Sequence, residues 1–224
     1  MKLYALIVAG GSGKRMGAEI PKQYLELAGK PVLMHTLERF KAFNESIEII
    51  TVLPENQIRF WADLQKKYSF NIPHTLVKGG KSRFYSVRNG LKFVENPGVV
   101  AIHDGVRPFV SIGTISRCFE TAQDLGNAIP VISPNDTLRI VNETGNYPVN
   151  RMQVRQVQTP QVFRADLIKR AYEQDYEPDF TDDATVLERT GIAINLVEGN
   201  RENIKITNPE DLVISTALLP AISR

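Results

Sequence analysis

A glycine-rich loop that carries several cations follows the first apolar segment of the chain. Residues 8–17 read V-A-G-G-S-G-K-R-M-G, and P-K-Q-Y follows at 21–24. Glycines allow backbone N–H groups to approach a phosphate chain closely, and a turn that leaves a strand presents several of these groups together. Lys14, Arg15 and Lys22 add positive charge. We interpret this segment as a loop that wraps the triphosphate of a nucleotide.

Two better-known phosphate loops do not fit this segment. The dinucleotide fingerprint G-x-G-x-x-G fails because Met16 stands where the third glycine belongs, and the P-loop fails because no glycine-lysine-hydroxyl triplet occurs here. An ordinary glycine-rich turn with solvated basic residues is the simpler alternative. Three closely spaced glycines at 10, 11 and 13, the two adjacent cations that follow them and a Pro-Lys pair shortly after make that alternative the weaker one.

A second group of polar residues, H-D-G-V-R-P at 103–108, follows a later apolar segment. Asp104 at a strand end could ligate Mg²⁺ or its waters, and Arg107 could grip a phosphate with its planar fork. A turn-capping aspartate and an ion pair between the two residues are the structural alternatives. The presence of the glycine loop in the same chain favours the functional interpretation.

Other candidate chemistries find little support. Lys205 lies between two isoleucines, and spacing alone does not separate an exposed lysine from a pocket lysine. His35, His74 and His103 lack metal-ligand spacing, and neither a G-x-S-x-G elbow nor a convincing Ser-His-Asp arrangement occurs. A cationic, metal-assisted phosphate site remains, and it suits nucleotidyl transfer by positioning and charge neutralisation.

The composition is that of a globular protein. Of the 224 residues, 42% are hydrophobic and 23% are charged, and the net charge of +2 argues against a generic nucleic-acid binder. No apolar segment approaches the ~20 residues that span a bilayer, so no membrane partner is expected, and the first apolar segment is too short for a signal peptide. Cys118 is the only cysteine, so we expect a small core residue and a reducing, cytoplasmic location.

Apolar segments with strand and helix patterns alternate along the chain. The expected strands are 3–9, 47–53, 74–77, 99–103, 128–132 and 193–197, and the expected helices are 32–43, 57–68, 82–94, 114–125, 165–174 and 183–190. This alternation predicts one α/β domain over 1–224, with a Rossmann-like, mostly parallel sheet and helices on both faces. Ligands of such sheets bind outside the carboxyl ends of the strands, where the glycine loop and Asp104 fall.

Residues 137–157 break this rhythm. Leu138 and Ile140 alternate with polar residues, 142–146 resemble a turn, and 150–157 form a second extended run. We expect a β-hairpin arm that projects from the domain. Because an isolated hairpin is marginally stable in water, a second subunit is its expected partner, and a flap on its own domain is the alternative.

Taken in order, these segments resemble the 2-C-methyl-D-erythritol 4-phosphate cytidylyltransferases. The resemblance covers essentially the whole chain and rests on A-G-G-S-G-K-R-M-G with P-K-Q-Y-L, G-G-K-S-R-F-Y-S-V, H-D-G-V-R-P, T-P-Q-V-F, T-D-D-A-T-V-L-E and N-I-K-I-T. It implies an enzyme of non-mevalonate isoprenoid biosynthesis that joins CTP to the polyol phosphate and releases pyrophosphate. It also implies Mg²⁺ and a homodimer.

The resemblance further implies roles by position. CTP would be held by small residues and loop backbone, namely Ala9, Gly10, Gly11, Gly13, Gly80 and Ser86. Three cations would serve catalysis: Arg15, Lys22 and Lys205. The polyol phosphate would meet Asp104, Arg107, Thr159, Thr137 and Arg151, the last two from the arm of the neighbouring subunit.

The chain departs from the family pattern at two places, and rival functions remain open. Lys81 replaces an acidic residue of some members, and Gly105-Val106 replaces two alanines of many. Ribitol 5-phosphate cytidylyltransferases share similar motifs. The segment 105–109 favours this family, whereas T-D-D-A at 181–184 favours the methylerythritol enzymes. A nucleotidyltransferase that uses GTP or UTP, a non-catalytic nucleotide-binding regulator and a dehydrogenase are the more distant alternatives.

Overall fold

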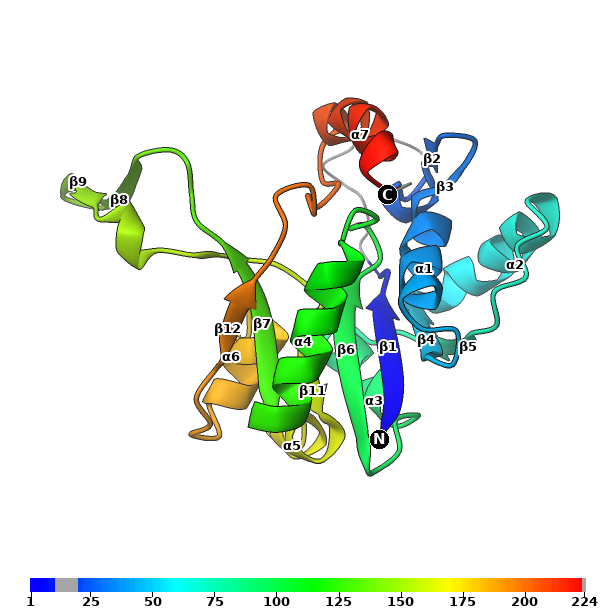
Figure 1. The fold of residues 1–224 in the computed structure, drawn as a ribbon, viewed down its shortest axis with the longest axis horizontal. Helices are drawn as coiled ribbons and strands as arrows, with labels where there is room; N and C mark the ends of the chain where they lie inside the picture. The colour runs from blue at the N-terminus through cyan, green and yellow to red at the C-terminus, as the bar shows by residue number, and fades with distance from the viewer. Residues whose placement is uncertain (11–19, 223–224) are drawn as a thin grey trace.

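The computed structural model describes residues 1–10 and 20–222. Its centre is an eight-stranded sheet in the order β10-β7-β11-β6-β1-β4-β5, with β12 beside β7 (Figure 1). The strands are β1 Lys2–Val8, β4 Glu48–Leu53, β5 Thr75–Lys78, β6 Gly98–Asp104, β7 Asn127–Ile132, β10 Gln156–Val157, β11 Gln161–Arg164 and β12 Leu196–Glu198.

The predicted parallel core is confirmed. Strand β1 runs parallel to β4 and β6, β4 to β5, and β12 to β7. The sequence did not predict β11, which lies antiparallel between β6 and β7, or the pairing of β10, which runs antiparallel to β7 on the same side as β11 and opposite β12. These two strands are four and two residues long, too short for a clear alternating pattern.

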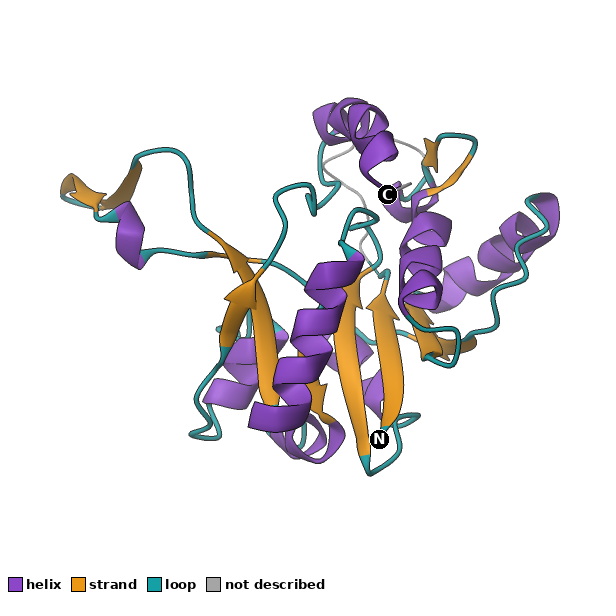
Figure 2. Cartoon of the chain, in the orientation of Figure 1, coloured by secondary structure: helices purple, strands orange, loops and turns teal. Residues whose placement is uncertain are grey.

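Helices cover both faces of the sheet because side chains of β1 alternate between two apolar clusters (Figure 2). Ala5 and Ile7 pack with α1 Val32–Phe43, α2 Ile58–Lys67 and α4 Ile112–Leu125, whereas Tyr4 and Leu6 pack with α3 Arg83–Leu91, α5 Ala165–Ala171 and α6 Asp183–Glu188. Cys118 is buried in the first cluster, as predicted, and burial raises the pKa of its thiol to about 12.

A third, smaller cluster lies near the carboxyl ends of the strands. The hairpin of β2 Glu26–Leu27 and β3 Lys30–Pro31 and the helix α7 Pro209–Ile222 both contribute to it. Val106 and Ile206 pack there against Leu27. This contact joins the segment after Asp104 and the segment around Lys205 to the hairpin that follows Lys22. No helix within the described residues is long and apolar enough to cross a membrane.

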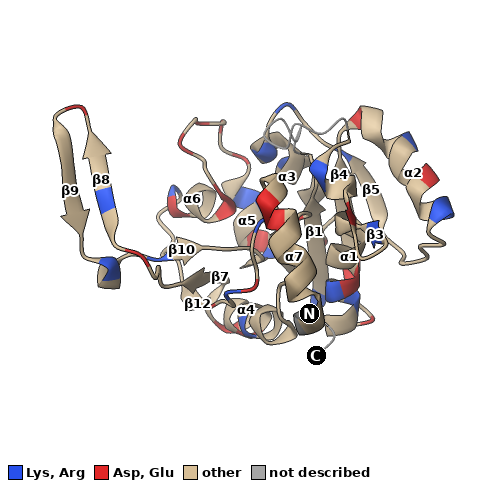
Figure 3. Cartoon of the chain, turned by 90° about the horizontal axis from the view of Figure 1, so that it is seen from above, with Lys and Arg blue, Asp and Glu red and all other residues tan. Residues whose placement is uncertain are grey.

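The predicted arm is a hairpin of β8 Leu138–Asn142 and β9 Gly145–Val149 that projects from the β7 side of the sheet (Figures 1 and 3). The predicted second run, 150–157, is correct only in part: it is not the second strand of the hairpin, since β9 ends at Val149, and a short 3-10 turn at Arg151–Gln153 precedes its one strand, β10. The turn is tighter than expected because the Asn142 carboxamide oxygen accepts the Thr144 N–H at 3.1 Å. The arm does not lie as a flap on its own domain.

Candidate active site

Parallel strands bring their carboxyl ends to one edge of the sheet, and the glycine loops begin there. The Gly105 N–H donates to the Val8 carbonyl at 2.9 Å, and the Gly79 N–H donates to the Leu53 carbonyl at 2.8 Å. These bonds continue the strand pairing one residue beyond β6 and β5 and fix where each loop leaves the sheet.

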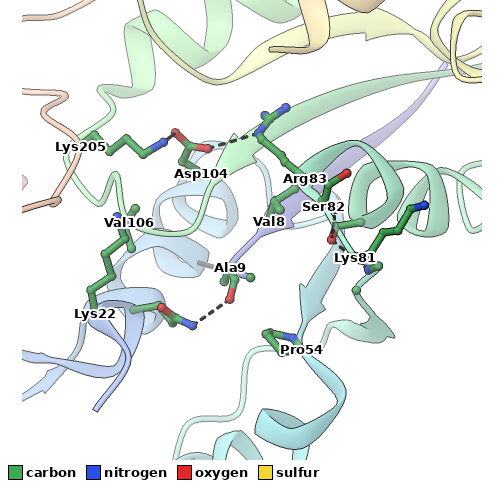
Figure 4. A pocket seen from close by; sticks show the side chains of 15 residues that line it. Val8, Ala9, Lys22, Pro54, Lys81, Ser82, Arg83, Asp104, Val106 and Lys205 are labelled. Atoms are coloured by element: carbon green, nitrogen blue, oxygen red, sulfur yellow. Dashed lines mark hydrogen bonds and ion pairs between the residues drawn. The ribbon is translucent and has the colours of Figure 1, made fainter. Parts of the chain in front are cut away.

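A cavity of about 360 Å³ opens at this edge (Figure 4). Of the residues assigned to the nucleotide and to catalysis, it is lined by Ala9, Gly10, Lys22, Gly80, Ser86 and Lys205. The predicted residues Gly11, Gly13 and Arg15 lie outside the described part of the chain. The remaining lining residues are Val8, Gln23, Pro54, Gly79, Lys81, Ser82, Arg83, Asp104 and Val106.

Ser86 shapes the glycine loop that forms one wall of this cavity. Its hydroxyl accepts the Gly80 N–H at 3.1 Å and donates to the Ser82 carbonyl at 2.9 Å. A Cβ at Gly80 would overlap the Cβ of Tyr85 and approach its carbonyl carbon to 3.0 Å. The close approach of α3 therefore requires glycine at this position.

Gln23 anchors the turn that carries Lys22, a role that the sequence did not suggest. It is buried in the 3-10 turn Lys22–Tyr24, and its carboxamide donates to the Ala9 carbonyl and to the Gln57 side chain, both at 2.9 Å. The Lys22 backbone is thereby tied to the end of β1. Lys22 lines the cavity together with Val106 and Asp104, and Val106 lies between the other two residues in the view of Figure 4.

A second cavity of about 170 Å³ adjoins the first, and both are lined by Arg83, Asp104 and Lys205. The predicted residues Arg107 and Thr159 line the second cavity but not the first. It is completed by Val157, Gln158, Gln161, Thr181 and Asp182. Lys205 lines both cavities, and its side chain is also 43% exposed, so it combines features of both alternatives.

Asp104, on the wall that the two cavities share, lies close to three cations. Its carboxylate is 3.0 Å from Lys205 Nζ, 3.3 Å from Arg107 Nε and 3.8 Å from Arg83 Nε. Burial alone would raise the pKa of this carboxyl, but the three cations outweigh burial and hold the pKa well below its usual range. Lys22 and Lys81 also line the larger cavity, so its lining carries an excess of positive charge, which favours phosphate ligands.

Arg83 is a site residue to which the sequence assigned no role. Its guanidinium donates to both carboxylate oxygens of Asp183, at 2.8 and 2.6 Å, and Asp183 also accepts the Tyr172 hydroxyl at 2.6 Å. Asp183 is fully buried, so this bidentate pair fixes the guanidinium beside Asp104. An arginine at the start of a helix that follows a glycine loop was the available signal.

The predicted arm residues Thr137 and Arg151 line neither cavity. Both are exposed, and the Arg151 guanidinium donates to the Asn135 carbonyl at 2.5 Å. The hairpin that they flank projects away from the central sheet (Figure 3). Their assigned role therefore requires another chain.

The described residues do not form a protein-built metal site. Within 1–10 and 20–222, no group of three or more His, Cys, Asp or Glu side chains could hold a metal ion. Asp104 is surrounded by cations, and the Asp182 carboxylate accepts the Thr185 N–H at 2.9 Å and the Gln161 carboxamide at 2.7 Å. Both carboxylates are thus engaged by protein partners, and Asp104 as a metal ligand stays a prediction.

Comparisons with known sequences agree with this geometry. A model of the 2-C-methyl-D-erythritol 4-phosphate cytidylyltransferase family matches residues 3–221. A protein of that name from Bacteroides fragilis is 56% identical over 215 residues, which cover 96% of this chain and 98% of the relative. One from Bacteroides thetaiotaomicron is 51% identical over 219 residues, 98% of this chain and 100% of the relative.

Solved structures with the same arrangement carry related names. The 4-diphosphocytidyl-2C-methyl-D-erythritol synthase of Anaerococcus prevotii matches with a TM-score of 0.82 at 30% identity and covers 98% of this chain and 96% of that one. The 2-C-methyl-D-erythritol 4-phosphate cytidylyltransferase of Thermus thermophilus matches with a TM-score of 0.79 at 31% identity and covers 97% and 98%.

Proposed function

Because the chain belongs to the 2-C-methyl-D-erythritol 4-phosphate cytidylyltransferase family, we propose that its larger cavity binds CTP and its smaller one the polyol phosphate. The family's activity, cytidylyl transfer to methylerythritol phosphate in non-mevalonate isoprenoid biosynthesis, is the activity of this chain. The wall of Arg83, Asp104 and Lys205 supports this assignment, because it is common to both cavities and phosphates bound in the two would lie on either side of it. A dehydrogenase and a non-catalytic regulator are set aside.

The reaction follows from that juxtaposition. A phosphate oxygen of the polyol phosphate attacks the α-phosphorus of CTP in line, the bond to the bridging oxygen breaks, and pyrophosphate leaves. Negative charge grows on the bridging and α-phosphate oxygens. Lys22 on one side of the cavity and Lys205 on the shared wall are positioned to stabilise that charge. Arg15 is assigned to the same task from the sequence.

We propose that Mg²⁺ arrives with the triphosphate rather than on Asp104. Magnesium keeps several waters and takes phosphate oxygens readily, so it needs few ligands from the protein. Bound in this way, it would supply further charge neutralisation. Asp104 would instead orient Lys205 and Arg107 through its two short ion pairs.

We propose that the active unit is a homodimer joined through the 137–157 arm. The arm exposes apolar side chains, including Val141 at 77% and Tyr147 at 49% of their surface. Burying them against a second copy would also bring Thr137 and Arg151 to the partner's smaller cavity. CTP is a cytoplasmic metabolite, and a cytoplasmic location belongs to the same proposal.

The substrate assignment predicts a clear preference in a pyrophosphate-release assay with purified protein and Mg²⁺. With CTP, methylerythritol 4-phosphate is expected to turn over at least about 100-fold faster than ribitol 5-phosphate, because a buried polar site rejects a mismatched ligand strongly. UTP and GTP in place of CTP test the nucleotide in the same assay. Preference for ribitol phosphate would move the chain to the related activity, and no release with either polyol would contradict the proposal.

The contact between Gly80 and α3 predicts that Gly80→Ala weakens nucleotide binding. The new methyl group must displace Tyr85 backbone or the loop itself, so KM for CTP is expected to rise by about 10-fold or more. Gly113→Ala is the matched control, since a Cβ at this exposed position on α4 approaches only the Arg117 side chain, at 3.4 Å. Equal KM values for the two variants would show that the loop does not contact the nucleotide.

A further inference from the structure

His103 lies near the end of β6, directly before the turn that carries Asp104 and Arg107. Its side chain is fully buried and lines neither cavity. One ring nitrogen, Nε2, is 3.0 Å from the Arg107 carbonyl oxygen, and the other, Nδ1, is 3.0 Å from the Thr159 hydroxyl. The imidazole thus joins the turn to the start of the T-P-Q-V-F segment.

The partners of the ring fix its tautomer. A carbonyl oxygen only accepts, so His103 Nε2 must carry a proton and donate to Arg107. In the neutral ring, Nδ1 is then an acceptor, and the Thr159 hydroxyl must donate to it. Burial disfavours the charged ring and lowers the pKa of His103 to about 4, which agrees with the neutral form.

Two more hydrogen bonds close a ring of four residues. The Arg107 guanidinium donates to the Asn203 carbonyl at 2.7 Å, and the Asn203 carboxamide donates to the Thr159 carbonyl at 2.8 Å. Asn203 and Thr159 are both buried, so neither bond competes freely with water. Asn203 also begins the N-I-K-I-T segment, so the ring reaches the loop that carries Lys205.

Asp104 is held by the same ring. Its N–H donates to the Thr159 hydroxyl oxygen at 3.1 Å, its carbonyl accepts the Arg107 N–H at 3.1 Å, and its carboxylate faces Arg107 Nε. The Thr159 hydroxyl therefore donates to His103 and accepts from Asp104. Its one proton is committed within the protein, so Thr159 has no proton left to offer a substrate.

We infer that His103 is a positioning residue for the polyol-phosphate side of the reaction: through the ring with Thr159, Asn203 and Arg107 it sets the orientation of Asp104 and Lys205. This inference rests on the proposed function. It assigns the proton of the Thr159 hydroxyl to His103 rather than to a hydrogen bond donated to the substrate.

A spectroscopic experiment tests the ring without any measurement of activity. Long-range ¹H–¹⁵N correlation spectra of the wild-type protein at neutral pH should show His103 as the Nε2–H tautomer, with the resonance identified by its loss in His103→Asn. Thr159→Val, which removes the hydroxyl and keeps the shape, should shift the Nδ1 resonance. An Nδ1–H tautomer, a charged ring, or an Nδ1 resonance unchanged in Thr159→Val would overturn the inference, whatever the enzyme's substrate.

Kinetics with CTP and the polyol phosphate give the second test. In Thr159→Val and in His103→Asn, KM for the polyol phosphate should rise by about 10-fold while KM for CTP changes by less than about 2-fold. Thr159→Ser, which keeps the hydroxyl, should restore the wild-type value. His74→Asn is the matched control, because that histidine bonds Trp61 outside both cavities.

The double variant makes the kinetic test stricter. Thr159→Val and His103→Asn open the same ring, so their combined effect on KM for the polyol phosphate should be little larger than that of the worse single change. Equal rises in both KM values, a Thr159→Ser variant as poor as Thr159→Val, or multiplied effects in the double variant would each contradict a positioning role.

Discussion

Lys22→Ala is expected to lower kcat by about 100- to 1000-fold while the protein stays folded, because removal of one preorganised charge contact typically costs that much. Lys22 lines the larger cavity, and Gln23 beside it holds the turn in place through two side-chain hydrogen bonds. The lysine ammonium would face charge that grows mainly in the transition state, so KM for CTP should change much less than kcat.

The fold and the reaction can be separated in this experiment. Lys22 is half-buried in a short turn, and Gln23 and Tyr24 supply the buried contacts there, so the thermal midpoint of unfolding should stay close to that of the wild type. Lys92→Ala, an exposed lysine after α3, is the control for loss of a positive charge alone. Near-wild-type kcat in Lys22→Ala would remove this lysine from catalysis.

The parts of the site that lie within one short segment could be predicted from the sequence. The glycine loop follows β1, and Asp104 ends β6; parallel pairing then places Val8 opposite Asp104. Strong periodicity explains why α1 begins and ends at the predicted residues, Val32 and Phe43. The order of strands at one sheet edge was enough to gather Ala9, Gly80 and Asp104 around one cavity.

Contacts between distant segments could not be predicted in this way. Arg83 meets Asp183 across 100 residues of sequence, and His103 meets Thr159 across 56. No local pattern records such pairs, because each residue alone satisfies an ordinary helix start or strand end. The same reason applies to β11, whose place between β6 and β7 depends on two partners far away in the chain.

Deletion of 138–149 is expected to give a monomer with little activity. Leu138 pairs with Val149 at the base of the hairpin, so a short glycine linker can join the two ends without disturbing the sheet. The deletion removes the exposed apolar side chains of the arm and displaces Thr137 and Arg151, which flank it. Sedimentation and pyrophosphate release on the same sample measure both consequences, and a dimeric, active deletion variant would contradict both roles.

A mixture of two inactive variants decides whether the arm serves the partner's site. Arg151→Ala should be inactive if Arg151 binds the polyol phosphate, and Lys22→Ala should be inactive through the larger cavity. In a mixed dimer, one site has two defects, whereas the other combines an intact Lys22 with an intact Arg151 from the neighbouring arm. Random exchange of subunits should therefore restore about a quarter of the wild-type activity. If each arm completed its own chain's site, every site in the mixture would keep one defect, and no activity would return.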